Sequence, residues 1–144
     1  MKEIRTEIVI KATPAEIWEV LTDFDSYPEW NPQIVRFDGK PMTDETFRLR
    51  AYSPDGSGMQ LGLKAKMVDV EVEKKLSWQG GFTGIFSGYH YWELNDLGTE
   101  TKVTQGEKFS GPLSFFLSQK RLKIMSGSYE AANRGLEKYI GGRS

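Results

Sequence analysis

The chain has 144 residues, a net charge of −1 and 12% aromatic residues, which is enough for one domain with a sizeable core. It has no cysteine, so disulfide bonds, thiolate catalysis and thiolate metal sites are excluded. Its 19 Lys and Arg balance its 20 Asp and Glu without long runs of like charge, so the composition indicates neither a nucleic acid nor an anionic membrane as partner.

The chain also lacks the features of an exported or membrane-spanning protein. Its first 12 residues alternate charged and apolar side chains, unlike a signal peptide. No stretch approaches the roughly 20 apolar residues that span a bilayer. We therefore expect a cytoplasmic protein without integral membrane contact, and the absence of cysteine fits a reducing compartment.

The N-terminal third predicts a strand followed by a short helix. Residues 2–12 alternate apolar and charged side chains, as in a half-buried strand. Residues 14–24 have the apolar spacing of a helix, and Thr13 with Glu16 forms a capping box at its start. Two residue–proline pairs in the sequence SYPEWNP end this helix, because the residue before a proline avoids the helical region.

The middle of the chain predicts a run of strands. Short segments alternate apolar and polar side chains, and turn residues separate them. In the third of these segments the apolar residues change phase after Met67, which predicts a bulge or a strong bend. The segments are 33–38, 46–52, 59–72, one that begins at Leu76, 86–94 and 99–109, of which the last two form a hairpin.

The C-terminal segment changes to helical periodicity. We predict one long helix over residues 113–140, ended by Gly141 and Gly142. One stripe of this helix is expected to face the sheet, and a second row of residues lies on its flank. The stripe comprises Phe116, Lys120, Ile124, Ser128, Ala131, Gly135 and Tyr139, and the flank comprises Leu117, Met125, Tyr129, Ala132, Leu136 and Ile140.

This order of elements predicts an α+β fold with an antiparallel sheet. Strands followed by a segregated helix are typical of that class. A sheet of this length curls, and the last helix has its concave face to cover. Because one helix does not fill the concavity, we expect a cavity between helix and sheet, and such cavities are common ligand sites.

Residues 13–32, TPAEIWEVLTDFDSYPEWNP, resemble the N-terminal signature of the SRPBCC superfamily, the START-like or polyketide cyclase/dehydrase-like domains. The order of elements matches over nearly the whole chain. The resemblance implies one helix-grip domain over residues 1–144, with a curved antiparallel sheet of about six or seven strands around a long C-terminal helix and short helices after the first strand. The superfamily uses this scaffold for many functions, so fold alone does not give function.

The predicted hairpin carries the residues with the most chemistry. His90 and Trp92 share one face of its first strand, and Gln105, Glu107 and Phe109 share one face of its second. Both faces are expected to point into the cavity, where His90 and Glu107 form an acid–base pair if they lie opposite each other. Three roles remain open for the pair: mutual hydrogen bonding only, orientation of a ligand, or general acid–base catalysis.

The hairpin also resembles its counterpart in the superfamily, where a His-x-Phe-x-Leu strand precedes a His-x-Glu-x-Phe-like strand. In this chain Trp92 and Gln105 replace two of the rings. One histidine remains in the whole protein, which excludes a mechanism that needs two imidazoles. One histidine with scattered carboxylates also makes no metal-ligand set, and we expect neither a metal nor a cofactor.

The candidate ligand-binding residues share an expected place on the inner face or at the mouth of the cavity. Tyr27, Trp30 and Phe82 are assigned to the mouth. The full set is Tyr27, Trp30, Trp78, Phe82, Phe86, His90, Trp92, Gln105, Glu107, Phe109, Phe116, Lys120 and Ile124, with His90 and Glu107 also the catalytic candidates.

Three functions are compatible with these residues. The favoured hypothesis is a monomer or homodimer that binds a small hydrophobic or amphipathic molecule, such as a lipid, a sterol or an aromatic polyketide-like compound. The second is a cyclase- or aromatase-like enzyme that uses His90 and Glu107, which differs from a carrier in losing turnover rather than affinity when they are changed. The third is a cochaperone-like interaction module, which requires an exposed apolar patch.

Overall fold

A computed structural model of the protein describes residues 2–53, 56–82 and 85–143, without the side chain of Phe82. In these ranges seven strands form one antiparallel sheet in the order β1-β7-β6-β5-β4-β3-β2. The strands are β1 (Lys2–Ile10), β2 (Ile34–Asp38), β3 (Thr46–Tyr52), β4 (Gln60–Glu71), β5 (Lys75–Phe82), β6 (Phe86–Asp96) and β7 (Thr101–Ser110). The helices are α1 (Pro14–Thr22), η1 (Phe24–Ser26), α2 (Tyr27–Trp30), η2 (Pro112–Phe116) and α3 (Gln119–Gly141).

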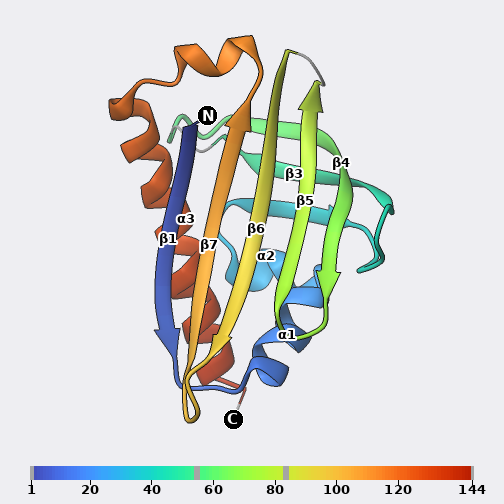
Figure 1. Cartoon of the computed structure of the whole chain (residues 1–144), viewed down its shortest axis with the longest axis vertical. Coiled ribbons are helices and arrows are strands. Elements are labelled where there is room, and N and C mark those ends of the chain that lie inside the picture. Colours follow the sequence, from blue (N-terminus) through green and yellow to red (C-terminus); the bar gives the residue numbers. More distant parts are fainter. Residues whose placement is uncertain (1, 54–55, 83–84, 144) are drawn as a thin grey trace.

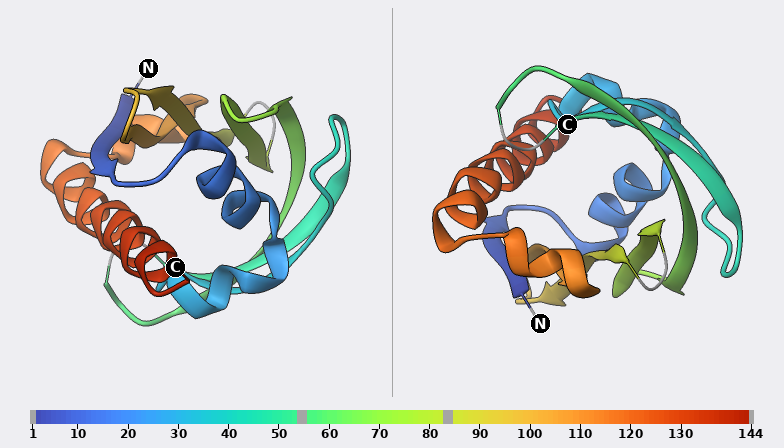
Figure 2. Two further views of the ribbon diagram at one scale, coloured as in Figure 1. Left: turned by 90° about the horizontal axis from the view of Figure 1, so that it is seen from below. Right: turned by 90° about the horizontal axis from the view of Figure 1, so that it is seen from above.

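The sheet curls around its helices, as expected for a helix-grip fold. Figure 1 shows α3 running beside β1 at one edge of the sheet, with α1 near the lower end of the molecule and α2 between α1 and the middle. Viewed along the molecule, the strands form a bent wall and the helices lie on its concave side (Figure 2). The predicted α+β class and helix-grip architecture are therefore confirmed. None of the described helices is both long and apolar enough to cross a membrane.

The helix after β1 begins where the sequence predicts. The Thr13 hydroxyl accepts a hydrogen bond from the Glu16 amide at 3.2 Å, and Glu16 Oε1 accepts one from the Thr13 amide at 3.4 Å. This reciprocal pair is the capping box, and it satisfies two N–H groups that a helix start leaves without intrahelical partners. The helix ends at Thr22, two residues before the predicted end, and the short helices η1 and α2 carry the chain to β2.

The predicted irregularity in β4 is also present. The pairing of β4 with β5 shifts register between Met67 and Val70. The Ser77 hydroxyl holds this bulge, because it accepts from the Asp69 amide at 2.9 Å and donates to Asp69 Oδ2 at 2.6 Å. Hydrogen bonds from Ser77 and then Tyr89 hold the pKa of Asp69 below its usual range.

The C-terminal segment differs from the prediction in two ways. It does not form one helix from residue 113: η2 ends at Phe116, and α3 starts after Ser118, whose hydroxyl accepts from the Arg121 amide at 3.1 Å. The face that α3 buries is the predicted flank rather than the predicted stripe. Its buried residues are Leu122, Met125, Tyr129, Ala132, Asn133, Leu136 and Ile140.

Candidate functional site

A cavity of about 330 Å³ lies between the concave face of the sheet and α3. Side chains of β2 to β7 and of α3 line it, and most of them are apolar. Leu61 and Leu63 lie on the inner face of β4 and line the cavity, yet they are 38% and 41% exposed. Inward-facing residues with that exposure mark an opening between the ends of β3 and β4 and the helix.

The hairpin of β6 and β7 supplies the polar part of the cavity. The register places His90 opposite Glu107 and Trp92 opposite Gln105, on the faces that the alternation of the sequence predicts to point inward. His90 Nδ1 lies 3.2 Å from Glu107 Oε1. The His90 ring also stacks on Trp78, with ring centroids 4.8 Å apart. The predicted cross-strand pair therefore exists, and the His90 ring is held in place by stacking on Trp78.

Tyr129 of α3 completes this cluster. Its hydroxyl donates to Glu107 Oε1 at 2.5 Å. Burial, followed by the charge of Glu107 and this hydrogen bond, raises the pKa of Tyr129 well above its ordinary value, so the phenol keeps its proton. The sequence places Tyr129 on the flank of the helix and gives no signal that it meets Glu107.

The hydrogen-bond pattern also fixes which atoms remain available. Glu107 Oε1 accepts from Tyr129 and lies within hydrogen-bond distance of His90 Nδ1, and no hydrogen bond among the described residues involves His90 Nε2. Among the described residues no hydrogen bond reaches Glu107 Oε2. That oxygen fits only because residue 88 is glycine: a Cβ there would lie 2.0 Å from it.

A second polar network ties the helix to the sheet beside this cluster. Gln105 Nε2 donates to the Tyr129 carbonyl at 3.0 Å and to Asn133 Oδ1 at 2.7 Å. Asn133 Nδ2 in turn donates to the Thr6 hydroxyl at 2.8 Å, so the network reaches from β7 through α3 to β1. These buried hydrogen bonds fix the position of α3 relative to β1 and β7, and therefore the position of the Tyr129 hydroxyl relative to Glu107.

The predicted candidates fall into three groups by location. Those on the inner faces of β5, β6 and β7 line the cavity, and those in the N-terminal corner and at the centre of β6 are buried in the core instead. Those at the start of the C-terminal segment are exposed, and the side chain of Phe82 lies outside the described residues. Trp78, Phe86, His90, Gln105, Glu107 and Phe109 line the cavity, Tyr27, Trp30 and Trp92 are buried without lining it, and Phe116, Lys120 and Ile124 are exposed.

The expected position of Tyr27 and Trp30 at the mouth is wrong. The Tyr27 hydroxyl donates to the Leu21 carbonyl at 2.6 Å, and its ring packs 4.9 Å from that of Phe37. Trp30 meets Trp92 edge to face at 5.9 Å. The segment after α1 thus folds into the core, because the rings of Tyr27 and Trp30 bury more apolar surface there than at the mouth of the cavity.

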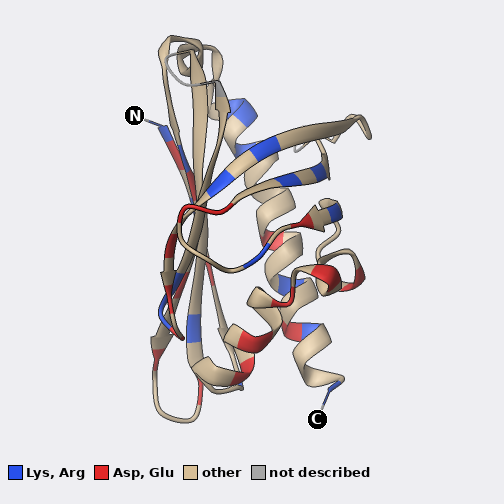
Figure 3. Cartoon of the chain, turned by 90° about the vertical axis from the view of Figure 1, so that its right-hand side faces the viewer, with Lys and Arg blue, Asp and Glu red and all other residues tan. Residues whose placement is uncertain are grey.

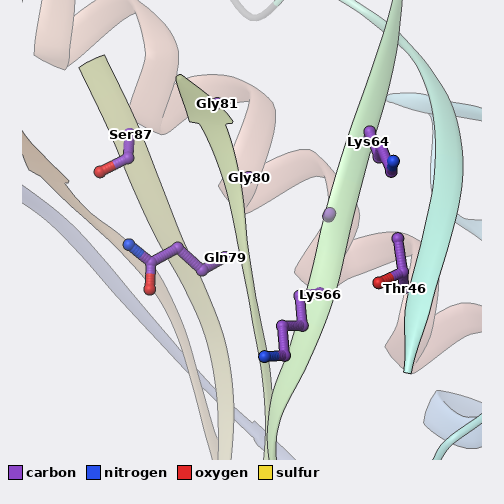
Figure 4. Close-up of a pocket in the computed structure, with 8 residues that line it drawn as sticks. Thr46, Lys64, Lys66, Gln79, Gly80, Gly81 and Ser87 are labelled. Atoms are coloured by element: carbon purple, nitrogen blue, oxygen red, sulfur yellow. The ribbon is translucent and has the colours of Figure 1, made fainter. Parts of the chain in front are cut away.

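A second hollow, of about 220 Å³, lies on the outer face of the sheet across β3 to β6. Figure 4 shows its lining, in which Thr46, Lys66 and Gln79 are cross-strand neighbours. Lys66 pairs with Asp44 at 3.5 Å. The polar lining of this second hollow does not suit an apolar ligand.

In the parts of the chain that the structure describes, no group of three His, Asp or Glu side chains is arranged to hold a metal ion.

Comparisons with known proteins agree with this architecture. The family model described as "Polyketide cyclase / dehydrase and lipid transport" matches residues 1–141, so the chain belongs to this family. This confirms the resemblance to the SRPBCC superfamily. No curated protein matches the chain.

Solved structures share the fold at low sequence identity. The TTHA0849 protein of Thermus thermophilus is 17% identical, with 99% of each chain covered and a TM-score of 0.78. A START superfamily protein of Mycobacterium smegmatis is 14% identical over 99% of each chain, with a TM-score of 0.76. DynU16, from the dynemicin biosynthetic locus, is 17% identical, and the match covers 98% of this chain and 48% of DynU16 with a TM-score of 0.73.

Proposed function

We propose that the protein binds a small, mostly apolar molecule that carries a hydroxyl group in the cavity between sheet and α3. The observation that supports this is an apolar, open cavity in which Glu107 Oε2 has no hydrogen-bond partner among the described residues. Its volume of about 330 Å³ is at the lower end of the range in which small-molecule pockets occur. Lipids, sterols and aromatic polyketide-like compounds are the classes to test.

The preference for a hydroxyl follows from the donors and acceptors at the site. Glu107 Oε1 already accepts from Tyr129 and lies against His90. Glu107 Oε2 remains as an acceptor for a ligand, and so does His90 Nε2 in the neutral tautomer that donates from Nδ1 to Glu107. A ligand that presents only acceptors would leave these atoms without partners and repel the carboxylate, whereas a hydroxyl or phenol donates to it.

Displacement of a fluorescent probe tests this proposal. The protein is titrated with an environment-sensitive apolar dye, which is then displaced with fatty acids, sterols and phenolic aromatic compounds. We expect saturable binding of one dye and stronger displacement by hydroxylated compounds than by their deoxygenated analogues. A folded protein that binds no dye, or that ranks the two kinds of compound equally, would contradict the proposal.

A second candidate is a cyclase-like enzyme, and the contact between His90 and Glu107 supports it. A histidine and a carboxylate 3.2 Å apart inside a cavity are within the reach of general acid–base catalysis. Substitution of either residue distinguishes the two functions. An enzyme loses turnover while keeping ligand affinity, and a carrier changes affinity because it has no turnover to lose.

A further inference from the structure

Opposite charges are segregated along the chain. Residues 108–129 contain four Lys or Arg and no Asp or Glu, whereas residues 12–33 contain five Asp or Glu and no Lys or Arg. The first segment forms the end of β7, η2 and the start of α3 at one end of the molecule, and the second forms α1 and α2 toward the other end (Figure 1). Figure 3 shows the upper part of α3 with Lys and Arg, while Asp and Glu gather on the lower helices. The net charge of −1 conceals this separation.

The basic end also exposes large apolar side chains. Phe115 and Phe116 of η2 are 82% and 72% exposed, and Ile85 and Leu113 are also exposed. We call these four residues the apolar tip. The Leu113 amide donates to the Ile85 carbonyl at 3.1 Å, so Ile85 and the start of η2 lie together.

The backbone of the apolar tip is held in place by Lys2 and by packing of the neighbouring Leu117. Lys2 Nζ donates to the carbonyls of Phe115 and Leu117, and Leu117 packs on a buried cluster that includes Phe109 and Met125. The two phenyl rings are therefore displayed by a fixed backbone while their side chains remain in solvent. A pair of neighbouring phenylalanines this exposed is unusual for a face that only meets water.

The apolar tip adjoins the cavity. Phe86 follows Ile85 directly and lines the cavity, and its ring lies 5.8 Å from that of Phe109, another lining residue. On α3, exposed Ile124 is one turn before Ser128, which lines the cavity, and Lys120 is one turn earlier. The stripe of residues that the sequence predicts to face the sheet thus runs along α3 from the apolar tip to the residues that line the cavity.

We propose that this end of the protein docks on the surface of an anionic lipid bilayer. The apolar tip would enter the headgroup region, and Lys120, Arg121 and Lys123 would lie against anionic headgroups. None of the ion pairs formed by the described residues involves these three cations, so their charge is available. Exposed aromatic residues flanked by Lys and Arg bind such surfaces by apolar burial together with electrostatic attraction.

Charge favours a bilayer over a second copy of the chain at this face. In a two-fold dimer through the apolar tip, the same cations of both copies would meet across the interface and repel each other. An anionic bilayer attracts them instead. Docking in this orientation places the cavity end of α3 at the membrane, where an apolar ligand could be exchanged without crossing water.

Vesicle flotation of the chain of residues 1–144 tests the proposal without any cavity ligand, so a negative result leaves the proposed ligand binding unaffected. The vesicles are phosphatidylcholine alone or phosphatidylcholine mixed with phosphatidylglycerol. The variants are Phe115→Ala/Phe116→Ala and Lys120→Gln/Lys123→Gln. The matched controls, on turns away from the tip, are Leu97→Ala for the apolar change and Lys11→Gln/Lys74→Gln for the charge change.

We expect the wild type to float with the anionic vesicles and not with the neutral ones. Loss of two cations should weaken partitioning about 25-fold, because each Lys or Arg near such a surface contributes about fivefold. Loss of both phenyl rings should weaken it at least about tenfold, and the controls should bind as the wild type does. All substituted side chains are exposed, so thermal midpoints should be unchanged.

Two results would overturn the proposal. One is the absence of flotation with anionic vesicles at low salt, or flotation that the tip variants and the controls show equally. The other is a concentration-dependent dimer that the phenylalanine substitutions abolish, seen by sedimentation without vesicle binding, which would assign the face to a second copy of the chain.

Discussion

Replacing Glu107 by glutamine should change which ligands bind while keeping the fold. The side-chain amide oxygen can still accept from Tyr129, whose hydroxyl lies 2.5 Å from Glu107 Oε1. The negative charge is lost, however, and hydrogen bonds to charged groups contribute about 1.5–3 kcal/mol against about 0.5–1.5 kcal/mol for neutral ones. The difference of about 1 kcal/mol corresponds to roughly a fivefold loss of affinity for a hydroxylated ligand.

The assay compares 2-naphthol with naphthalene by fluorescence titration. We predict that Glu107→Gln weakens binding of 2-naphthol about fivefold and leaves binding of naphthalene unchanged. Tyr129→Phe is the matched control, because it removes the phenol and keeps the carboxylate, and it should retain the preference for 2-naphthol. Equal losses for both compounds in Glu107→Gln would refute the assignment of Glu107 as the group that selects the hydroxyl.

Leucine at the same position separates the structural role from the binding role. Glu107→Leu leaves the buried Tyr129 hydroxyl without its acceptor, which costs about 1–3 kcal/mol of unfolding free energy. We still expect a folded protein in which the preference for hydroxylated ligands disappears. A variant that fails to fold would show that the contact with Tyr129 is chiefly structural.

Three further predictions concern the surroundings of the site. Gly88→Ala should reduce the preference for 2-naphthol as the glutamine variant does, because the added methyl group would lie 2.0 Å from the cavity carboxylate; an unchanged preference would contradict this. Gly135→Ala should lower the urea midpoint through a loss of about 1–3 kcal/mol, since its Cβ would meet a carbonyl of α2 at 1.9 Å. Its control on the same helix, Gly127→Ala, meets nothing within 4 Å and should stabilise the protein by up to about 1 kcal/mol; midpoints that move together would refute the contact. Asp69 has a lowered pKa, so its contribution to stability is present above about pH 4 and is lost as the pH falls through the folded-state pKa. On acidification, Asp69→Asn should therefore lose less unfolding free energy than the wild type. Parallel curves of unfolding free energy against pH for the two proteins would contradict this.

Local patterns in the sequence were sufficient for much of the sheet and for half of the site. Strict alternation in residues 86–94 and 99–109 predicts that His90 and Glu107 both point inward, because a two-residue period leaves one choice of face once the apolar residues point inward, and the register of the strands then brings the two residues opposite each other. The capping box at Thr13 likewise depends on residues three positions apart. Such features need no knowledge of distant contacts, and they were predicted correctly.

The helix face was not predictable in the same way. Helical periodicity continues through Leu113 and Leu117, so the sequence suggests one helix from residue 113, whereas Ser118 starts a new one. The predicted stripe and flank both lie within α3 from Lys120 onward, and the packing of the helix on the sheet, which periodicity alone does not specify, turns Tyr129 inward and Ile124 to solvent. The corner at Tyr27 was misplaced for a different reason, since its burial depends on long-range packing against Phe37.

The most direct test of the central claim is dye binding by the wild type and by Ala51→Trp. Ala51 lines the cavity on β3 and is partly exposed, so a larger side chain there can fill the cavity without entering the closed core. We predict saturable one-to-one binding by the wild type and binding at least about tenfold weaker by the variant, with equal thermal midpoints. Equal dye affinity in the two proteins would show that the dye binds elsewhere and would contradict a ligand site between the sheet and α3.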